Sequence, residues 1–133
     1  LDTSLGPADV AVLLPHSPRS AARWAEGQRE TERAIAGILR ERDASPPQLA
    51  LGDINATPTG FRSRRLRSAL ELADAKPLLA LAGTWPAGAP WPAQAAIDAV
   101  LHASSLRPVS WERLRIPGSD HMGVRVTLTA RSR

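Results

Sequence analysis

Cysteine and tyrosine are both absent from the 133-residue sequence. Without cysteine the chain can form no disulfide, no thiolate-ligated metal site and no cysteine nucleophile, so redox chemistry gives no information about its compartment. No apolar stretch approaches the ~20 residues that a membrane-spanning helix needs. The first residues lack the basic and apolar segments of a signal peptide. The sequence does not begin with Met, so we expect it to start inside a longer gene product.

Lysine is almost absent as well, because Lys76 is the only one, and arginine carries nearly all of the positive charge. Arginine keeps its proton at any physiological pH, which explains a high isoelectric point at a net charge of only +4. This charge suits a phosphorylated or polyanionic ligand. A biased genomic base composition explains the arginine content more simply, so composition alone assigns no ligand.

A strand, a helix and a second strand are predicted in the first half of the chain. Residues 9–14 form a short apolar run closed by Pro15, which indicates a buried strand. Ser20 is a plausible N-cap for a helix that extends to Arg42. Side chains at alternating steps of four and three mark one face of this helix: Trp24, Gln28, Thr31, Ile35 and Ile38. Residues 48–51 indicate the second strand, and this order favours a layered α/β fold.

The second half of the chain combines a short helix with further strands. The helix is expected at about residues 62–72, and strands are expected at residues 96–101, 109–116 and 124–128. Residues 83–92 are rich in proline and glycine, so we expect a loop that runs over the surface. The length fits one domain, and no repeat or linker divides residues 1–133.

Three polar clusters lie at the ends of predicted strands. They are Asp53 with Asn55, then Asp98, and then Asp120 with His121. Strands fix the backbone, and the loops at their ends expose polar groups to a shared cleft. Carboxylates hold Mg²⁺ or Mn²⁺, an amide orients water or phosphate, and an imidazole transfers protons. These groups together are what the hydrolysis of a phosphoester with a hard cation requires.

The three clusters together resemble the endonuclease/exonuclease/phosphatase superfamily, which has the DNase I-like fold. The elements that carry the resemblance are Gly-Asp-Ile-Asn-Ala-Thr-Pro at 52–58, Ile97-Asp98, and Ser119-Asp120-His121. They occur in the family's order and at its approximate spacing. The resemblance implies an α/β (α+β) structure: the C-terminal half of a two-sheet β-sandwich flanked by helices, with residues 1–133 forming a partial domain. It also implies a metal-dependent phosphoester hydrolase.

The same resemblance implies a role for each residue of the clusters. Asp53 and Asn55 would position the attacking water and the scissile phosphate, with Asp53 also near the metal. Asp98 would orient His121 and stabilise its charged form. His121 would contact the phosphate as acid, base or electrostatic stabiliser. Asp120 would bind Mg²⁺ or Mn²⁺ directly or through water.

Each residue also has an ordinary structural interpretation when it is taken alone. Asp53 and Asn55 are typical of an Asx turn before Pro58. Asp98 could be a solvent-facing carboxylate of an edge strand, and His121 a surface histidine. These separate interpretations do not explain why the three clusters occur together.

The sequence departs from the family pattern in its first strand and upstream of it. Relatives carry a histidine near the end of this strand, where Leu14 stands here, and His16 is a possible substitute. The family's first half normally supplies a Glu metal ligand and an Asn, and residues 1–8 contain no counterpart. We therefore expect a missing N-terminal half, or a homodimer partner, to complete the site.

Several functional questions stay open at this stage. The phosphoester substrate could be a nucleic acid, a lipid-linked compound or a small molecule. Arginines at 62, 64, 65 and 67 could bind phosphate, although a solvated helix face is the simpler interpretation. His102 is expected at the surface. The sequence Gly83-Thr84-Trp85-Pro86 resembles a loop of bacterial members, which leaves the bacterial envelope and the cytoplasm both open.

Two alternatives to an enzyme are also kept open. The first is a non-catalytic, truncated or split relative that only binds or assembles with a partner, which the departures in the first half favour. The second is a basic nucleic-acid-binding module, which rests on arginine content alone.

Overall fold

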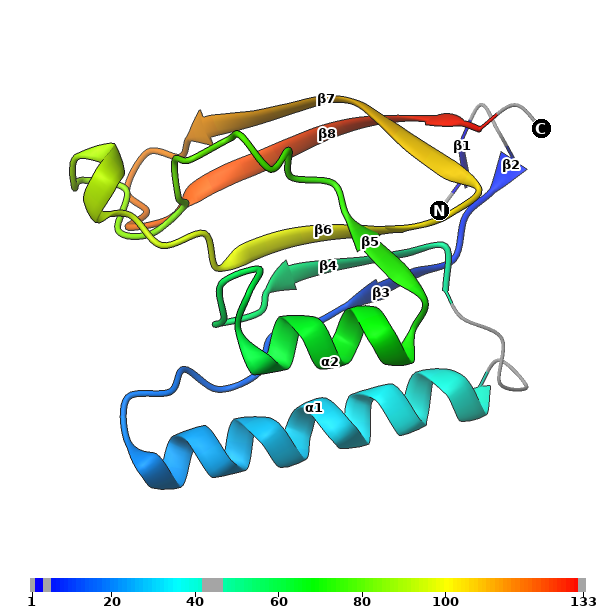
Figure 1. Ribbon diagram of the computed structural model, residues 1–133, viewed down its shortest axis with the longest axis horizontal. Coiled ribbons are helices and arrows are strands. Elements are labelled where there is room, and N and C mark those ends of the chain that lie inside the picture. Colours follow the sequence, from blue (N-terminus) through cyan, green and yellow to red (C-terminus); the bar gives the residue numbers. More distant parts are fainter. Residues whose placement is uncertain (1, 4–5, 42–46, 132–133) are drawn as a thin grey trace.

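A four-stranded sheet lies at the centre of the computed structural model, which describes residues 2–3, 6–41 and 47–131 (Figure 1). Across the sheet the strands follow the order β3 (Val10–Val12), β4 (Leu49–Asp53), β6 (Asp98–Ala103) and β5 (Leu72–Asp74). Strands β3 and β4 are parallel, and the other neighbours are antiparallel. A parallel pair needs a long crossover, which α1 (Ala21–Glu41) provides.

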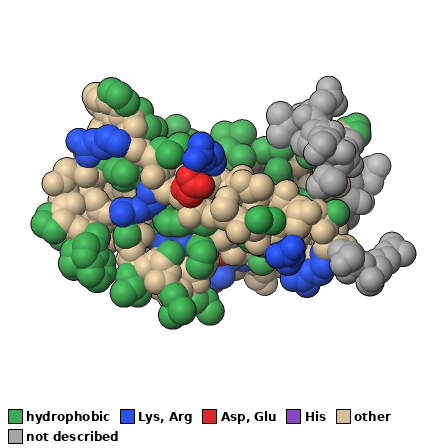
Figure 2. Space-filling view, turned by 90° about the horizontal axis from the view of Figure 1, so that it is seen from above, with side chains coloured by type: hydrophobic (Ala, Val, Ile, Leu, Met, Phe, Trp, Pro, Cys, Tyr) green, Lys and Arg blue, Asp and Glu red, His purple; other side chains and the backbone are tan. Residues whose placement is uncertain are grey.

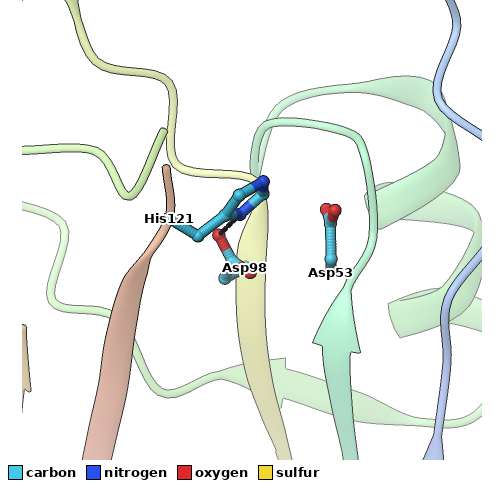
Figure 3. A group of neighbouring side chains, drawn as sticks. All are labelled: Asp53, Asp98 and His121. Carbon is cyan, nitrogen blue, oxygen red and sulfur yellow. Dashed lines mark hydrogen bonds and ion pairs between the residues drawn. The ribbon is translucent and has the colours of Figure 1, made fainter. Parts of the chain in front are cut away.

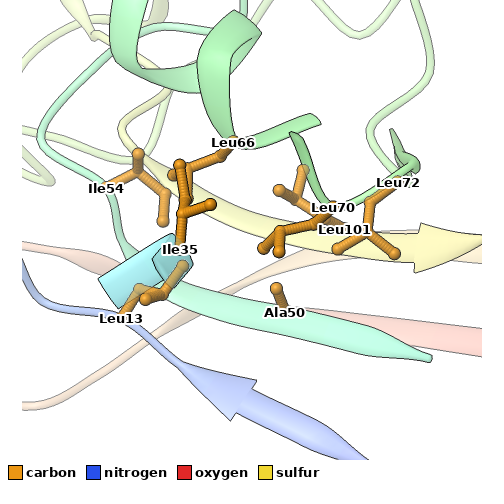
Figure 4. Close-up of a cluster of buried hydrophobic side chains, with 8 residues drawn as sticks. All are labelled: Leu13, Ile35, Ala50, Ile54, Leu66, Leu70, Leu72 and Leu101. Carbon is orange, nitrogen blue, oxygen red and sulfur yellow. The ribbon is translucent and has the colours of Figure 1, made fainter. Parts of the chain in front are cut away.

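Two helices cover one face of this sheet and enclose the core. Helix α1 forms the outer layer, and α2 (Phe61–Ala69) packs between it and the strands (Figure 1). The buried apolar side chains come from both helices and from the sheet (Figure 4): Leu13, Ile35, Ala50, Ile54, Leu66, Leu70, Leu72 and Leu101. The hydrophobic effect therefore stabilises the sheet through its helix-covered face.

A long antiparallel hairpin lies on the other side of the sheet from the helices (Figure 1). It consists of β7 (Leu106–Arg115) and β8 (Met122–Ala130). Two short strands near the N-terminus, β1 (Asp2–Thr3) and β2 (Gly6–Pro7), pair with each other. A 3-10 turn, η1 (Trp91–Ala93), interrupts the connection between β5 and β6. In the described part of the chain, no helix is both long and apolar enough to cross a membrane.

The predicted first helix is confirmed, including its cap. The backbone N–H of Arg23 donates to Ser20 Oγ at 3.2 Å, so Ser20 satisfies a free donor of the first turn. On the face marked by the apolar spacing, Thr31 and Ile35 are buried, whereas Trp24 is 52% exposed. At this end of the helix the buried stripe passes through Gly27, where the side chain of Arg62 crosses the helix.

The strand predicted at residues 9–14 is present, but it is not buried on both faces. Leu13 points to the helices, whereas Val12 is 73% exposed and Leu14 is 78% exposed. Successive side chains of a strand point to opposite faces. The apolar run therefore reflects a strand with one packed face and one open apolar face, a distinction that its composition does not reveal.

The strands predicted in the second half are confirmed as β6, β7 and β8, with β7 starting earlier than expected. The helix predicted at about residues 62–72 ends at Ala69 as α2, and Leu72 instead begins β5. Strand β5 was not predicted, because three residues are too few to show a period. The expectation that residues 83–92 only run over the surface is wrong for part of the segment. Thr84 is 0% exposed and Ala87 is buried, because this segment packs between β6 and the start of β8.

Gly52 is required by a close approach of two strands. Its φ of 142° lies in a region that L side chains rarely adopt. A Cβ at this position would collide with the carbonyl oxygen of Leu13. The backbone of Leu13 also donates to the Leu51 carbonyl at 2.9 Å, so the strand end lies directly against β4. Glycine thus allows the chain to place Asp53 immediately after this contact.

We predict that Gly52→Ala destabilises the native state by about 2–3 kcal/mol or more, because steric collision adds to backbone strain. Urea unfolding of the two proteins measures the difference. Gly88→Ala is a suitable control, since a Cβ at Gly88 meets nothing within 4 Å. The control is expected to change stability by less than ~0.5 kcal/mol. Equal stability of Gly52→Ala and the parent would contradict the steric explanation.

Candidate active site

Strand pairing places two aspartates side by side. Asp53 is the last residue of β4 and Asp98 is the first of β6, and the two are directly opposite in the antiparallel register. Residues opposite one another in a sheet have their side chains on the same face. Both side chains therefore emerge on the face away from the helices. His121, just before β8, adds its imidazole from the hairpin (Figure 3).

The three side chains form a compact group. One ligand-capable atom from each of Asp53, Asp98 and His121 lies within 4.8 Å of the others. His121 Nδ1 lies 3.0 Å from Asp98 Oδ2. An ionised carboxylate can only accept, so Nδ1 carries the hydrogen and donates it. The second ring nitrogen, Nε2, is then left to interact with a ligand on the side away from Asp98 (Figure 3).

Asn55 holds the carboxylate of Asp53. Its backbone N–H donates to Asp53 Oδ1 at 2.9 Å, and its side-chain Nδ2 donates to Oδ2 at 3.2 Å. The same Nδ2 donates to the carbonyl of Pro15 at 3.0 Å. Asn55 has a φ of 51°, a conformation that asparagine tolerates better than most residues. The Asx-turn interpretation is thus confirmed, and the turn orients the carboxylate that faces Asp98.

The structure places Asp120 outside this group. Its Oδ2 accepts a hydrogen bond from the indole nitrogen of Trp85 at 3.1 Å. This hydrogen bond is the largest cause that lowers the pKa of the Asp120 carboxyl below its ordinary value. The rings of Trp85 and His121 lie 6.5 Å apart between centroids. Asp120 is therefore adjacent to the group, but in the described residues it is not among the side chains that converge.

The surroundings shift the pKa values of both Asp53 and His121, but for different physical reasons. Burial is the largest influence on the pKa of Asp53, and it raises this pKa. The hydrogen bond from Asn55 lowers the pKa and the charge of Asp98 raises it, so the net change is upward. Burial lowers the pKa of His121, but the hydrogen bond and charge of Asp98, with the charges of Asp53 and Asp120, outweigh it. The pKa of His121 is consequently raised, so its charged form is favoured.

Thr84 holds the backbone of the site, a role that the sequence did not reveal. Its Oγ1 accepts the backbone N–H groups of Ile97 and Asp98, each at 3.2 Å. Its carbonyl accepts the N–H of Met122 at 2.8 Å. One buried residue thus connects the start of β6 to the start of β8. The Gly-Thr-Trp-Pro sequence was the available signal, but nothing in it indicates which strands the threonine would join.

Two further histidines lie away from the group. His16, the possible substitute for the first-strand histidine, pairs through Nδ1 with Glu30 of α1 at 2.5 Å. It does not join Asp53, Asp98 and His121. The expectation of a surface position for His102 is wrong, because its side chain is buried and its Nδ1 lies 2.9 Å from the carbonyl of Ala103. A carbonyl only accepts, so this nitrogen carries the hydrogen.

The arginines of α2 do not form a single solvated face. Arg62 is buried, whereas Arg65 forms a bidentate pair with Glu32 of α1. Arg64 and Arg67 donate to backbone carbonyls of the preceding loop. The interpretation of these residues as a helix exterior is therefore wrong for Arg62, whose guanidinium is turned into the protein.

The comparison with family models agrees with the geometry of the site. Residues 2–121 match the Endonuclease/Exonuclease/phosphatase family, and the chain belongs to this family. The matched range contains both strand-end aspartates, Asn55 and His121. The resemblance inferred from the short motifs is thus confirmed. Among curated proteins, no sequence matches this chain.

Solved structures confirm the predicted fold class. An endonuclease/exonuclease/phosphatase from Beutenbergia cavernae has a TM-score of 0.66 at 22% identity, over 98% of this chain and 38% of its own. The corresponding protein from Bacteroides vulgatus has a TM-score of 0.63 at 20% identity, over 80% and 46%. A mannosyl-6-phosphatase from Bacteroides thetaiotaomicron has a TM-score of 0.51 at 17% identity, over 86% and 48%. This chain therefore spans less than half the length of these three structures.

We predict that NMR titration places the pKa of His121 above its ordinary value of 6.5 and that Asp98→Asn lowers it. Because the folded pKa is raised, the pair stabilises the fold fully below pH 6.5 and loses this effect as the pH rises through the folded pKa. Glu112→Gln changes an exposed carboxylate on β7 and is the control. An unchanged His121 titration in Asp98→Asn would show that the two side chains are not coupled.

Proposed function

We propose that the protein is a metal-dependent phosphoester hydrolase that uses an activated water. The observation that carries this proposal is the convergence of Asp53, Asp98 and His121 within 4.8 Å from three separate strands or strand ends. Family membership supports a phosphoesterase-type chemistry. In-line hydrolysis needs a group that accepts a proton close to a group that donates one, and carboxylates beside an imidazole provide both.

The donor set fits a hard divalent cation. Asp53 and Asp98 place carboxylates next to each other, and burial leaves the Asp53 charge incompletely solvated. Mg²⁺ and Mn²⁺ prefer such oxygen ligands. We assign Asp53 as the chain's main ligand for the cation, with Asp120 as a further ligand through water. When bound, the cation would polarise the phosphoryl oxygens and neutralise charge.

Asp53 and Asn55 would act on the attacking water and the phosphate. Two hydrogen bonds from Asn55 hold the carboxylate of Asp53, so its oxygens would be oriented in advance toward the cation and the attacking water. The carboxamide of Asn55 is bonded to Asp53 and Pro15, so its orientation is fixed before a substrate arrives. Such preorganisation reduces the reorganisation that the reaction would otherwise require.

His121 would donate from Nε2 to an oxygen of the phosphate. Its Nδ1 is engaged with Asp98, which fixes the tautomer and favours the charged ring. A charged imidazole can stabilise a non-bridging oxygen or protonate the leaving oxygen. Asp98 thus acts through His121 and needs no contact with the substrate.

The proposed substrate is a phosphoester whose organic part is undecided. Nucleic acids, lipid-linked compounds and small molecules all contain the bond that such a group would hydrolyse. One structural neighbour is named for a mannosyl-6-phosphatase activity, which makes a sugar phosphate one candidate to be tested. At 17% identity this neighbour supports the fold, and the choice of substrate needs direct assay.

We predict that Mg²⁺ or Mn²⁺ allows hydrolysis of a generic phosphodiester or phosphomonoester and that EDTA abolishes it. Asp53→Ala and His121→Ala are each expected to lower kcat by ~10²–10⁴-fold, because general acid–base and metal contributions are of this size. Glu112→Ala is the control. Activity that persists in both variants and in EDTA would refute this mechanism. Activity absent under all conditions, even with the partner described next, would favour the non-catalytic alternative.

We also propose that another segment or a second copy of the chain covers the open face of the sheet. Val12 and Leu14 are mostly exposed on this face although both are apolar. The hairpin adds further exposed apolar side chains: Val109, Leu114 and Ile116. Hydrophobic side chains are also visible over the surface seen from above (Figure 2). The matched part of this chain covers 46% of the Bacteroides vulgatus structure and 38% of the Beutenbergia cavernae structure, so more than half of each lies outside the match. Exposed apolar side chains that gather on one surface mark an interface.

We predict that the 133-residue chain self-associates in solution and that Val12→Thr with Leu14→Gln weakens the association. Both side chains point away from the core, so the substitutions should leave the helix-covered layer folded. Sedimentation velocity over a concentration series measures the assembly state, and urea unfolding checks the fold. A monodisperse parent monomer that unfolds cooperatively would contradict this proposal.

A further inference from the structure

We propose that Arg62 is a positioning residue that fixes the loop carrying Asn55, a role that rests on the proposed hydrolase function of the site. Arg62 lies in the first turn of α2 and is only 3% exposed. Its Nη1 donates to the carbonyl of Ile54 at 2.8 Å and to that of His16 at 3.3 Å. Its Nε donates to Gln28 Oε1 at 3.4 Å.

These contacts join the two segments on which the orientation of Asn55 depends. Ile54 lies between Asp53 and Asn55 in the chain. His16 directly follows Pro15, whose carbonyl accepts the side-chain amide of Asn55 at 3.0 Å. A single guanidinium therefore holds the backbone on both sides of the bond between Asn55 and Pro15. The planar fork of arginine can reach two carbonyls at once, which the single ammonium of lysine does less well.

Direct binding of the substrate is a poor explanation for Arg62. A residue with 3% exposure offers little surface to a phosphate, and its hydrogen bonds go to neutral acceptors within the protein. Burying a charged group among such acceptors is unfavourable compared with leaving it in water. We therefore explain the burial of Arg62 by the backbone segment that its hydrogen bonds hold in place. This segment contains Asp53 and Asn55.

Gly27 of α1 supplies the space that this arrangement needs. A Cβ on Gly27 would collide with Arg62 Nη2 and would lie 3.0 Å from the carbonyl oxygen of His16. Glycine is the less stable choice inside a helix, and at Gly27 the collision with Arg62 supplies a packing reason for it. Gly37 lies in the same helix, where an added Cβ would meet nothing within 4 Å. The two glycines therefore form a matched pair for an experiment.

The experiment compares Gly27→Ala and Arg62→Lys with the controls Gly37→Ala and Arg33→Lys, an exposed arginine of α1, in the whole protein. Hydrogen exchange of the Asn55 backbone amide and the NMR shifts of its side-chain amide are measured first, because neither needs activity. We expect faster exchange by at least ~10-fold and shifted carboxamide signals in the two test variants, since Asp53 and Pro15 lose a fixed partner. The controls should match the parent.

Kinetics then separate positioning from substrate binding. Arg62→Lys is expected to lower kcat by ~10–100-fold with KM changed less than about twofold, because a small misplacement of catalytic groups has effects of this size. Gly27→Ala should have little further effect in the Arg62→Lys background if both act on the same guanidinium.

The outcomes distinguish this proposal from the hydrolase proposal. Folded test variants whose Asn55 amides exchange and resonate as in the parent would overturn the role of Arg62, whatever their activity. A predominant rise in KM would instead make Arg62 a substrate-binding residue and would also overturn it. A parent that stays inactive with Mg²⁺ or Mn²⁺, even with its partner, would reject the hydrolase, while a loss of Asn55 protection in the test variants alone would still establish that Arg62 orders this loop.

Discussion

The antiparallel register between β4 and β6 is the constraint on which the site depends. It places Asp53 opposite Asp98, and a slip by one residue would send one of the carboxylates to the helix-covered face. The register is fixed by burial, because Ala50 and Leu101 must face the core. The hydrophobic packing of one face thus determines the polar chemistry at the edge of the other.

Much of the site lies on loops, which lack the regular backbone hydrogen bonds between strands. Buried polar side chains hold the backbone of these loops instead. Thr84 connects the start of β6 with the start of β8. Arg62 connects the loop after β4 with the segment after β3. Both side chains lie away from solvent, where hydrogen bonds compete less with water. The connection through Thr84 restricts Asp98, and the connection through Arg62 restricts Asn55.

The sequence was sufficient to predict the strand–helix–strand order and the residues that converge at the site, because local apolar patterns and short motifs record both. Thr84, Arg62 and the exposure of Val12 could not be predicted from it. Their roles depend on which distant segments become neighbours. In another fold the same residue types could lie in an exposed loop, on a helix surface or in a buried core. Asp120 illustrates the limit within a motif, since the position beside His121 does not fix the direction of its carboxylate.

The adjacency of Asp53 and Asp98 also has a consequence for how the protein can change by mutation. Like charges placed opposite one another on paired strands disfavour folding by roughly 0.2–1 kcal/mol. Burial adds to this effect at Asp53, as the raised pKa of its carboxyl indicates. A neutral residue that still accepts the backbone hydrogen bond of Asn55, such as asparagine, would relieve this repulsion and the cost of burial. Under the proposed hydrolase function, selection for stability and selection for activity would act in opposite directions at this one residue.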